Sequence, residues 1–408
     1  MTANRPRSVL SGTLLLVLVP LLAGAAAAQE LKIEEQTLSN GLKLLLLARK
    51  DEPAVSAGWV AHVGSVNERP GITGISHLFE HMMFKGTHTI GTTNYPEDLK
   101  IIKEQEEVRS GMREEEAKMR AAWRKGEIDD ITKPENETPR YRELQKRFDE
   151  LVKEQRKIIV KEEYDRIYTK AGGSGINAFT TNDMTGYFVT VPKNRLELWF
   201  WMESDRLENP VFREFYAERD VVYEERRRSV ESTPTGRLDE AFDALFWHST
   251  PYTWSVIGYP SDVAHITKAE ADAYYSLYYA PNNLTAILVG DFDPKEAREL
   301  AERYFGRIPR GKSLPPAVTT LPPRWEYDVC LEGEADTNPQ IEIRWHTVPF
   351  EHRDSYPLQV LASVLNGRTG RLEKALVLPP DGPATSASAS AGGHLGPDKY
   401  AGAFSISA

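Results

Sequence analysis

The stretch His77-Leu78-Phe79-Glu80-His81 decides the fold, and it lies in an apolar segment that Gly86 closes. The spacing of the apolar residues predicts a mostly buried helix over residues 76–84. His77 and His81 are four residues apart, so on a helix both imidazoles project from one face and can hold a single metal ion. The alternative is a pair of histidines on a wet helix face, which the apolar flanks disfavour.

Glu80 lies three residues after His77, at the edge of the same helix face. Its carboxylate is therefore placed to accept a proton from an attacking water molecule rather than to bind the metal itself. The order H-x-x-E-H is the inverted form of the zinc peptidase motif. The sequence thus predicts a zinc site with Glu80 as the general base.

A further ligand must come from another part of the chain. The helix predicted over residues 211–230 carries Glu218 and Glu225, which are seven residues apart and therefore share a face. We interpret Glu225 as the ligand and Glu218 as a supporting carboxylate that orients the site. From the residues alone, Glu224 competes almost evenly with Glu225, and all three carboxylates could also belong to an ordinary solvated helix face.

Together with residues 64–68 and 74–87, these motifs resemble the pitrilysin or insulinase family of zinc peptidases, which includes the mitochondrial processing peptidase. The register of residues 218–225 against the second motif of that family makes Glu225 the ligand and Glu218 the supporting acid. The resemblance implies one zinc ion per chain.

A second resemblance concerns the substrate. Residues 175–180 are similar to the edge strand on which that family pairs the substrate backbone. The resemblance implies that Asn177 and Ala178 contact the substrate. Residues 248–252 and 278–305 are similar to the later part of the same domain.

The resemblance also implies a fold and an activity. The fold class is α+β, with two related pseudo-repeat domains of the processing-peptidase type, each an antiparallel-rich sheet with packed helices. The implied activity is zinc-dependent endopeptidase hydrolysis of peptides or unfolded segments by Glu80 and an activated water. The alternative is a catalytically silent or partner-dependent subunit of a heteromeric complex, with a homologous chain or a second copy as partner. An intact Glu80 favours catalysis, because a scaffold has no need of it.

We divide the chain into four parts on composition and motifs. Residues 1–28 have the pattern of a bacterial-type signal peptide, and residues 29–312 form the catalytic domain. The Pro-rich residues 313–324 are the linker. Residues 325–408 are expected to be a second pseudo-repeat domain that is incomplete. The chain is therefore expected to be exported, periplasmic or secreted, with no stable membrane span after signal cleavage. The alternative is an uncleaved anchor, because residues 9–28 are nearly long enough to span a bilayer.

Residues 97–168 are dominated by Glu, Lys and Arg, and we interpret them as a charged helical hairpin inserted in the catalytic domain. Its predicted arms cover residues 104–125 and 140–168. The insertion explains why His81 and Glu225 are 144 residues apart, a separation longer than is typical of the family. A solvated spacer is the favoured interpretation, and a specific docking arm is the alternative.

Composition excludes some classes of protein. The formal net charge of −10 argues against nucleic acid as a partner. The single cysteine, Cys330, allows no intrachain disulfide, and we expect it to pack in a strand over residues 327–331. Apolar runs at residues 42–47 and 55–63, after a turn signal at residues 40–41, predict paired strands.

Overall fold

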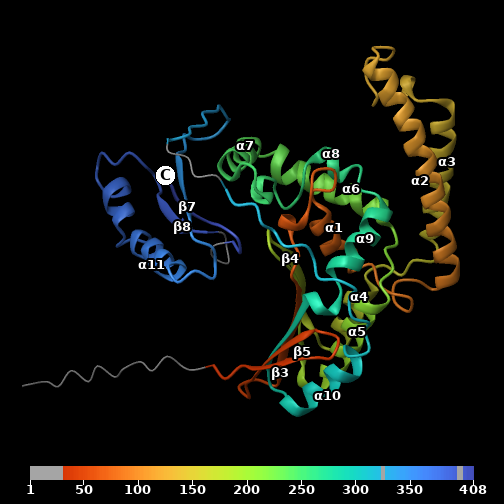
Figure 1. Ribbon diagram of the computed structural model, residues 1–408, viewed down its shortest axis with the longest axis horizontal. Coiled ribbons are helices and arrows are strands. Elements are labelled where there is room, and N and C mark those ends of the chain that lie inside the picture. The colour runs from red at the N-terminus through yellow and green to blue at the C-terminus, as the bar shows by residue number, and fades with distance from the viewer. Residues whose placement is uncertain (1–30, 323–326, 393–397) are drawn as a thin grey trace, which may run out of the picture.

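The computed structural model describes residues 31–322, 327–392 and 398–408 (Figure 1). The predicted signal peptide, residues 1–28, lies outside these described residues. The chain mixes two β-sheets with helices, which confirms the α+β class, and the second domain is partial. In the described ranges, no helix is both long enough and apolar enough to cross a bilayer.

The larger sheet has six strands in the order β1-β2-β6-β3-β5-β4. Only the β2–β6 pair is parallel, and the other four neighbouring pairs are antiparallel. The strands are β1 (Glu34–Thr37), β2 (Lys43–Ala48), β3 (Ala54–Ala61), β4 (Ser174–Thr180), β5 (Thr185–Pro192) and β6 (Leu284–Gly290). Strand β4 lies at one edge, so one side of its backbone is not paired within this sheet.

Helices cover one face of the six-stranded sheet (Figure 1). Among them are α1 (Ile75–Met82), α5 (Leu196–Glu208) and α6 (Phe215–Arg226). The remaining helices of this domain outside the insertion are α4 (Glu163–Lys170), α7 (Gly236–Trp247), α8 (Pro260–Val263), α9 (Lys268–Tyr278) and α10 (Pro294–Tyr304). Strand β3 alternates buried and more exposed side chains, as expected when one face packs against helices.

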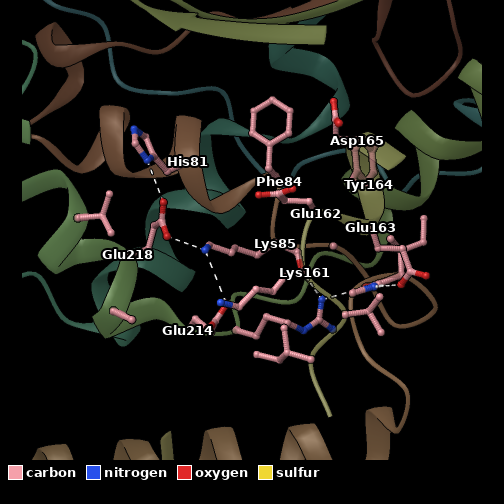
Figure 2. Close-up of a pocket in the computed structure, with 18 of the residues that line it drawn as sticks. His81, Phe84, Lys85, Lys161, Glu162, Glu163, Tyr164, Asp165, Glu214 and Glu218 are labelled. Atoms are coloured by element: carbon pink, nitrogen blue, oxygen red, sulfur yellow. Dashed lines mark hydrogen bonds and ion pairs between the residues drawn. The ribbon is translucent and has the colours of Figure 1, made fainter. Parts of the chain in front are cut away.

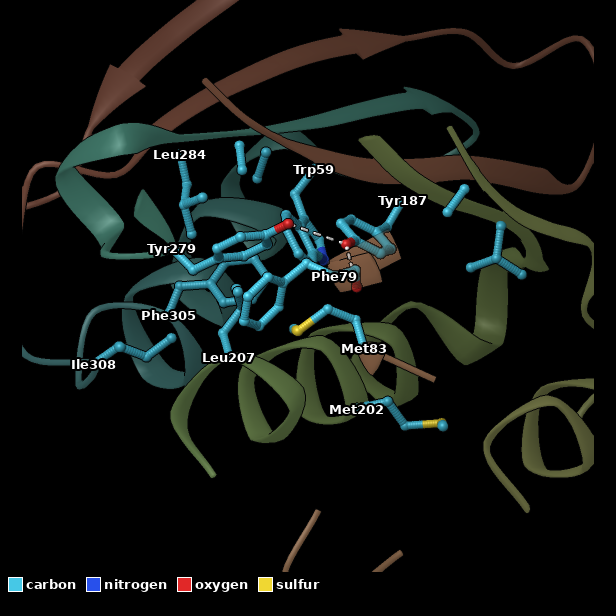
Figure 3. Close-up of a cluster of buried hydrophobic side chains, with 14 of the residues drawn as sticks. Trp59, Phe79, Met83, Tyr187, Met202, Leu207, Tyr279, Leu284, Phe305 and Ile308 are labelled. Carbon is cyan, nitrogen blue, oxygen red and sulfur yellow. Dashed lines mark hydrogen bonds between the residues drawn. The ribbon is translucent and has the colours of Figure 1, made fainter. Parts of the chain in front are cut away.

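The core lies between that sheet face and the helices, and aromatic side chains fill much of it (Figure 3). Trp59 of β3 stacks on Tyr187 of β5, with ring centroids 4.3 Å apart. The Tyr187 hydroxyl donates a hydrogen bond of 3.1 Å to the carbonyl oxygen of Phe79 in α1. The helix with the H-x-x-E-H motif is thereby fixed to β5, which lies next to the edge strand β4.

The inserted segment forms two long helices, α2 (Tyr95–Arg124) and α3 (Pro139–Gln155), which project from one side of the domain (Figure 1). The second arm is shorter than expected, because it ends at Gln155 and the residues up to Lys170 form the separate helix α4. Tyr164 and Tyr168 of α4 are buried and donate hydrogen bonds to Glu203 of α5, which joins α4 to the domain core.

The second sheet has three antiparallel strands in the order β7-β9-β8. The strands are β7 (Glu342–Thr347), β8 (Ser388–Ala391) and β9 (Gly402–Ser407), and helix α11 (Ser355–Leu365) packs beside them. This unit contacts α7 of the first domain, because Arg344 forms an ion pair with Asp243 and His346 stacks on Phe246 at 4.0 Å.

Two further expectations from the sequence are wrong. Strands β2 and β3 do not pair with each other, because β6 lies between them; the turn at residues 40–41 instead joins β1 to β2. Residues 327–331 are not a strand, since no neighbouring strand pairs with their backbone, and Cys330 is exposed rather than packed.

Candidate metal centre

Helix α1 begins at a tightly held turn. Gly74 has a φ of +90°, which favours glycine, and the buried carboxyl group of Glu68 accepts hydrogen bonds from the N–H groups of Gly74 and Ser76, both at 2.8 Å. Asp262 holds the preceding loop by accepting from the N–H and hydroxyl groups of Thr73. These contacts satisfy main-chain donors at the helix start and fix where its side chains point.

His77 and His81 project from α1 toward Glu225 of α6. The Nε2 atom of His77 lies 3.7 Å from one carboxylate oxygen of Glu225, and Nε2 of His81 lies 3.5 Å from the other. One donor atom from each of the three residues lies within 4.8 Å of the other two. Ligands bound tetrahedrally at about 2.0–2.2 Å lie about 3.3–3.6 Å apart, so the two distances between imidazole and carboxylate, and the types of donor, fit a zinc ion.

The two glutamates that compete in the sequence have different surroundings. Glu224 forms an exposed ion pair with Arg227, with nitrogen–oxygen distances of 2.9 and 3.1 Å. Glu225, one residue on, faces the two imidazoles. Of the two, only Glu225 is brought to the histidines.

The pKa values of the two imidazoles are shifted in opposite directions. Burial, with a smaller contribution from the charge of His81, lowers the pKa of His77 to about 4, so His77 is neutral and can offer a lone pair. The pKa of His81 is raised overall. Burial alone would lower it, but the hydrogen bond and the charge of Glu218, together with the charges of Glu225 and Glu80, have the larger effect. His81 therefore lies in an acidic setting that also favours a cation bound at its ring.

Glu218 contacts His81 at Nδ1, the ring nitrogen that does not face Glu225 (Figure 2). One of its carboxylate oxygens is 2.9 Å from Nδ1 of His81, and the other is 2.5 Å from the ammonium of Lys85. Burial raises the pKa of Glu218, but His81 and Lys85 together lower it to about 2. Glu218 is therefore ionised, accepts the Nδ1 proton of His81, and leaves Nε2 of that ring free to bind a metal.

Glu80 lies beside the three donor atoms without being one of them. The hydroxyl of Thr180, at the end of β4, donates a hydrogen bond of 2.7 Å to its carboxylate. Burial raises the pKa of Glu80, although Thr180 and then His81 offset part of that rise. A carboxylate with a raised pKa is a better proton acceptor, as a general base requires.

Two cavities flank the centre. The larger, of 540 Å³, is lined by Glu80, His81 and Phe84, by Arg156 and residues 159–165, and by Asn177 and Ala178 of β4 (Figure 2). The second, of 490 Å³, is lined among others by His77, Glu80, Ala178, Thr180 and Glu225. Asn177 is exposed and Ala178 is buried, so the edge strand lies along both cavities.

Sequence reasoning missed Lys85 and Thr180, which contact Glu218 and Glu80 respectively. Thr180 is the last residue of the predicted edge strand, so its proximity could have been suspected once that strand was placed beside α1. Lys85 follows the motif directly, but nothing in the local pattern indicates that its ammonium reaches a carboxylate more than 130 residues later.

Two family models match the chain: "Insulinase (Peptidase family M16)" over residues 44–111 and "Peptidase M16 inactive domain" over residues 265–408. The zinc protease PqqE of Helicobacter pylori is 26% identical over 353 residues, which are 85% of this chain and 64% of PqqE. The probable zinc protease PqqL of Escherichia coli is 26% identical over 305 residues, 73% of this chain and 26% of PqqL. The chain thus spans less than two thirds of the length of either relative.

Solved structures show the same fold. A crystal structure of a protease from Helicobacter pylori superposes with a TM-score of 0.70 at 21% identity, covering 92% of this chain and 74% of that one. The periplasmic protease PqqL from Escherichia coli gives a TM-score of 0.57 at 19% identity, covering 92% of this chain and 35% of that one.

Proposed function

Since the chain belongs to the M16 (pitrilysin/insulinase) family, we propose that it is a zinc-dependent endopeptidase in which His77, His81 and Glu225 hold the metal and Glu80 is the general base. The observation that carries this proposal is the convergence of three donor atoms within 4.8 Å of one another, with a carboxylate of raised pKa beside them. The fit of this donor set to zinc agrees with the names of the relatives, which are zinc proteases.

When bound, zinc supplies Lewis-acid activation of water and of the peptide carbonyl. Glu80 takes a proton from the attacking water and passes it to the departing amine, while the hydroxyl of Thr180 keeps its carboxylate oriented. Glu218 keeps His81 in the tautomer whose Nε2 faces the centre.

The edge strand β4 supports a way of binding the substrate. Its free side lies next to both cavities, so an extended peptide can add to the sheet there and pass Glu80. Asn177 and Ala178 then contact the substrate backbone. Strand addition requires an extended chain, and the substrates we propose are therefore peptides or unfolded segments.

One observation favours a second function. Residues 265–408 match a model described as an inactive domain, and the cytochrome b-c1 complex subunit 1 of Bos taurus is 23% identical over 200 residues. On this alternative, the chain is a silent or partner-dependent subunit, working with a homologous chain or a second copy. The presence of Glu80 in contact with Thr180 favours catalysis, because a purely structural subunit does not need that carboxylate.

We propose the same domain division as the sequence suggests: a signal peptide over residues 1–28, a catalytic domain over 29–312 with the insertion at 97–168, a linker over 313–324, and an incomplete second domain over 325–408. We also propose export to the periplasm or beyond the cell. A supporting point is that the solved PqqL relative is described as a periplasmic protease.

Metal analysis combined with peptide hydrolysis tests the proposal. Purified wild type should carry one zinc ion and cleave an unstructured peptide, and EDTA should remove both properties until zinc is restored. Glu80→Gln should keep the zinc and lose cleavage, whereas Glu225→Gln and His77→Ala should lose the zinc. Glu224→Gln is the matched control, because it changes a neighbouring carboxylate that pairs with Arg227, and it should keep both.

Two results would count against this assignment. Cleavage by Glu80→Gln at the wild-type rate would remove Glu80 as the base. Wild type that binds zinc but cleaves no peptide, alone or as a dimer, would favour the partner-dependent subunit instead.

A further inference from the structure

We propose that Asp98 and Arg213 are positioning residues of the metal centre: this buried ion pair holds α1 and α6 in register, and the inserted hairpin supplies one half of it. The inference rests on the proposed function, because it concerns how the helices that carry the proposed zinc ligands are held. It gives the insertion a part in metal binding, in place of the solvated spacer that its composition suggests.

Arg213 joins the exit of α1 to the entry of α6. It lies two residues before α6, is 1% exposed, and donates hydrogen bonds to the carbonyl oxygens of Lys85, Thr87 and Ile90 in the loop that follows α1. The bonds to Thr87 and Ile90 are 2.8 and 2.9 Å long. One side chain thus fixes the position of one ligand helix against the other.

The backbone of residues 85–91 lies close against the guanidinium of Arg213. Gly86 and Gly91 have φ values of +96° and +94°, a conformation that favours glycine. A Cβ atom at either position would lie 2.8 or 2.6 Å from Nη1 of Arg213. The close approach of the side chain to the loop therefore depends on both glycines.

The counter-charge comes from the insertion. Asp98, in the first turn of α2, is fully buried and accepts a hydrogen bond of 2.8 Å from Nε of Arg213. Gln155 at the end of α3 donates to the other Asp98 oxygen at 2.8 Å, and Gln105 of α2 donates to Gln155 at 3.1 Å. A buried guanidinium is costly without a paired charge, so Arg213 depends on the base of the hairpin.

A continuous set of contacts leads from this pair to the centre. The carbonyl oxygen of Lys85 accepts from Arg213, and the ammonium of Lys85 contacts Glu218 at 2.5 Å. Glu218 in turn lies 2.9 Å from Nδ1 of His81. A shift of the loop would withdraw Lys85 from Glu218 and loosen the orientation of His81, since outer partners of this kind set the geometry of a ligand.

The test compares zinc affinity in Asp98→Asn, Gln155→Leu and Leu44→Ala with wild type, by competition with a chromogenic zinc chelator. Asp98→Asn keeps the shape and removes the charge, and Gln155→Leu is a milder variant for use if Asp98→Asn does not fold. Leu44→Ala is the stability control, because Leu44 is buried in β2, which is separated from β5 by two other strands and from β4 by three. Amide hydrogen exchange of residues 85–91 in metal-free protein is the second readout.

We expect zinc affinity to fall about tenfold in Asp98→Asn, at the low end of the range of about 10- to 100-fold for outer contacts of metal ligands, and about threefold, below that range, in the milder Gln155→Leu. Exchange in the 85–91 loop should become faster in both, while Leu44→Ala keeps wild-type affinity. Wild-type affinity in a folded Asp98→Asn variant, or an equal loss of affinity in Leu44→Ala, would overturn the inference. A wild type that binds no zinc would refute the proposed function, and unchanged loop exchange in Asp98→Asn would separately refute the role of Asp98 in holding the loop.

Discussion

The carboxyl group of Glu68 gives a quantitative test of how the first ligand helix is held. Its two oxygens accept the N–H groups of Gly74 and Ser76 at 2.8 Å, and its side chain is buried. Burial raises the pKa of Glu68 to about 8, and the hydrogen bonds from Ser76 and Gly74 offset only part of the rise. In the folded chain, Glu68 therefore keeps its proton up to about pH 8, whereas the ordinary value is 4.5.

The direction of the pH dependence follows from this difference. Because the folded-state pKa is the higher one, the folded chain binds more protons between pH 4.5 and about 8, and stability falls as the pH rises through that window. The rise of roughly 3.5 pH units, at about 1.4 kcal/mol per unit, sets the full loss above pH 8 at no more than about 5 kcal/mol. Glu68→Gln removes the titration but turns an amide NH₂ toward one main-chain N–H, which costs about 1–3 kcal/mol.

Urea unfolding of wild type and Glu68→Gln, at intervals from about pH 5 to about pH 8, measures the effect. The variant should be the less stable protein at pH 5, by about 1–3 kcal/mol, and the difference should shrink or change sign by pH 8. Asn94→Ala is the control, because Asn94 caps α2 by accepting from the N–H of Glu97 at 3.3 Å and carries no titrating group. Its loss of about 1 kcal/mol should be the same at each pH. A constant difference between wild type and Glu68→Gln over this range would refute the reasoning.

Three further predictions follow from contacts around the centre and the core. Glu203→Gln should lower the free energy of unfolding by about 3–5 kcal/mol, because it leaves the buried guanidinium of Arg206 without its counter-charge. The double variant Glu203→Gln/Arg206→Met should recover most of this loss in the same urea assay. Glu218→Gln should weaken zinc binding about 10- to 100-fold in chelator competition through its contact with His81, and an unchanged affinity would contradict the role given to Glu218. Gly86→Ala should destabilise the chain by more than about 1 kcal/mol in thermal unfolding, because the φ of Gly86 is +96° and a Cβ there would clash with the carbonyl oxygen of Ile90. An unaltered Tm would argue against this.

The parts of the fold that follow from local pattern were predictable. The apolar spacing around His77 predicted α1, and the seven-residue separation of Glu218 and Glu225 predicted that both lie on one face of α6. The choice between Glu224 and Glu225 could not be made from the helix alone, because it depends on which face meets α1. Packing of α6 against α1 decides it, and such packing joins residues far apart in the chain.

Polar contacts between distant segments were not predictable for the same reason. In the sequence, Asp98 looks like an ordinary charge of the insertion and Arg213 like one of a predicted helix, and only the fold reveals that both are buried together. The charge-rich composition of the insertion also concealed its buried base, since most of its Glu, Lys and Arg side chains are indeed exposed or half-exposed. Local composition describes the average surroundings of a segment and says little about its few buried polar residues.

The position of β6 determines when this domain can fold. Ile287 of β6 pairs with Leu45 on one side and with Gly58 on the other, so the two N-terminal strands are joined only through a strand made more than 200 residues later. During synthesis, a nascent chain that ends before Leu284 can form the local α2–α3 hairpin but cannot close the six-stranded sheet. Until that point, the edges of β2 and β3 that pair with β6 are open, and unpaired strand edges are sites at which a chain can associate with another.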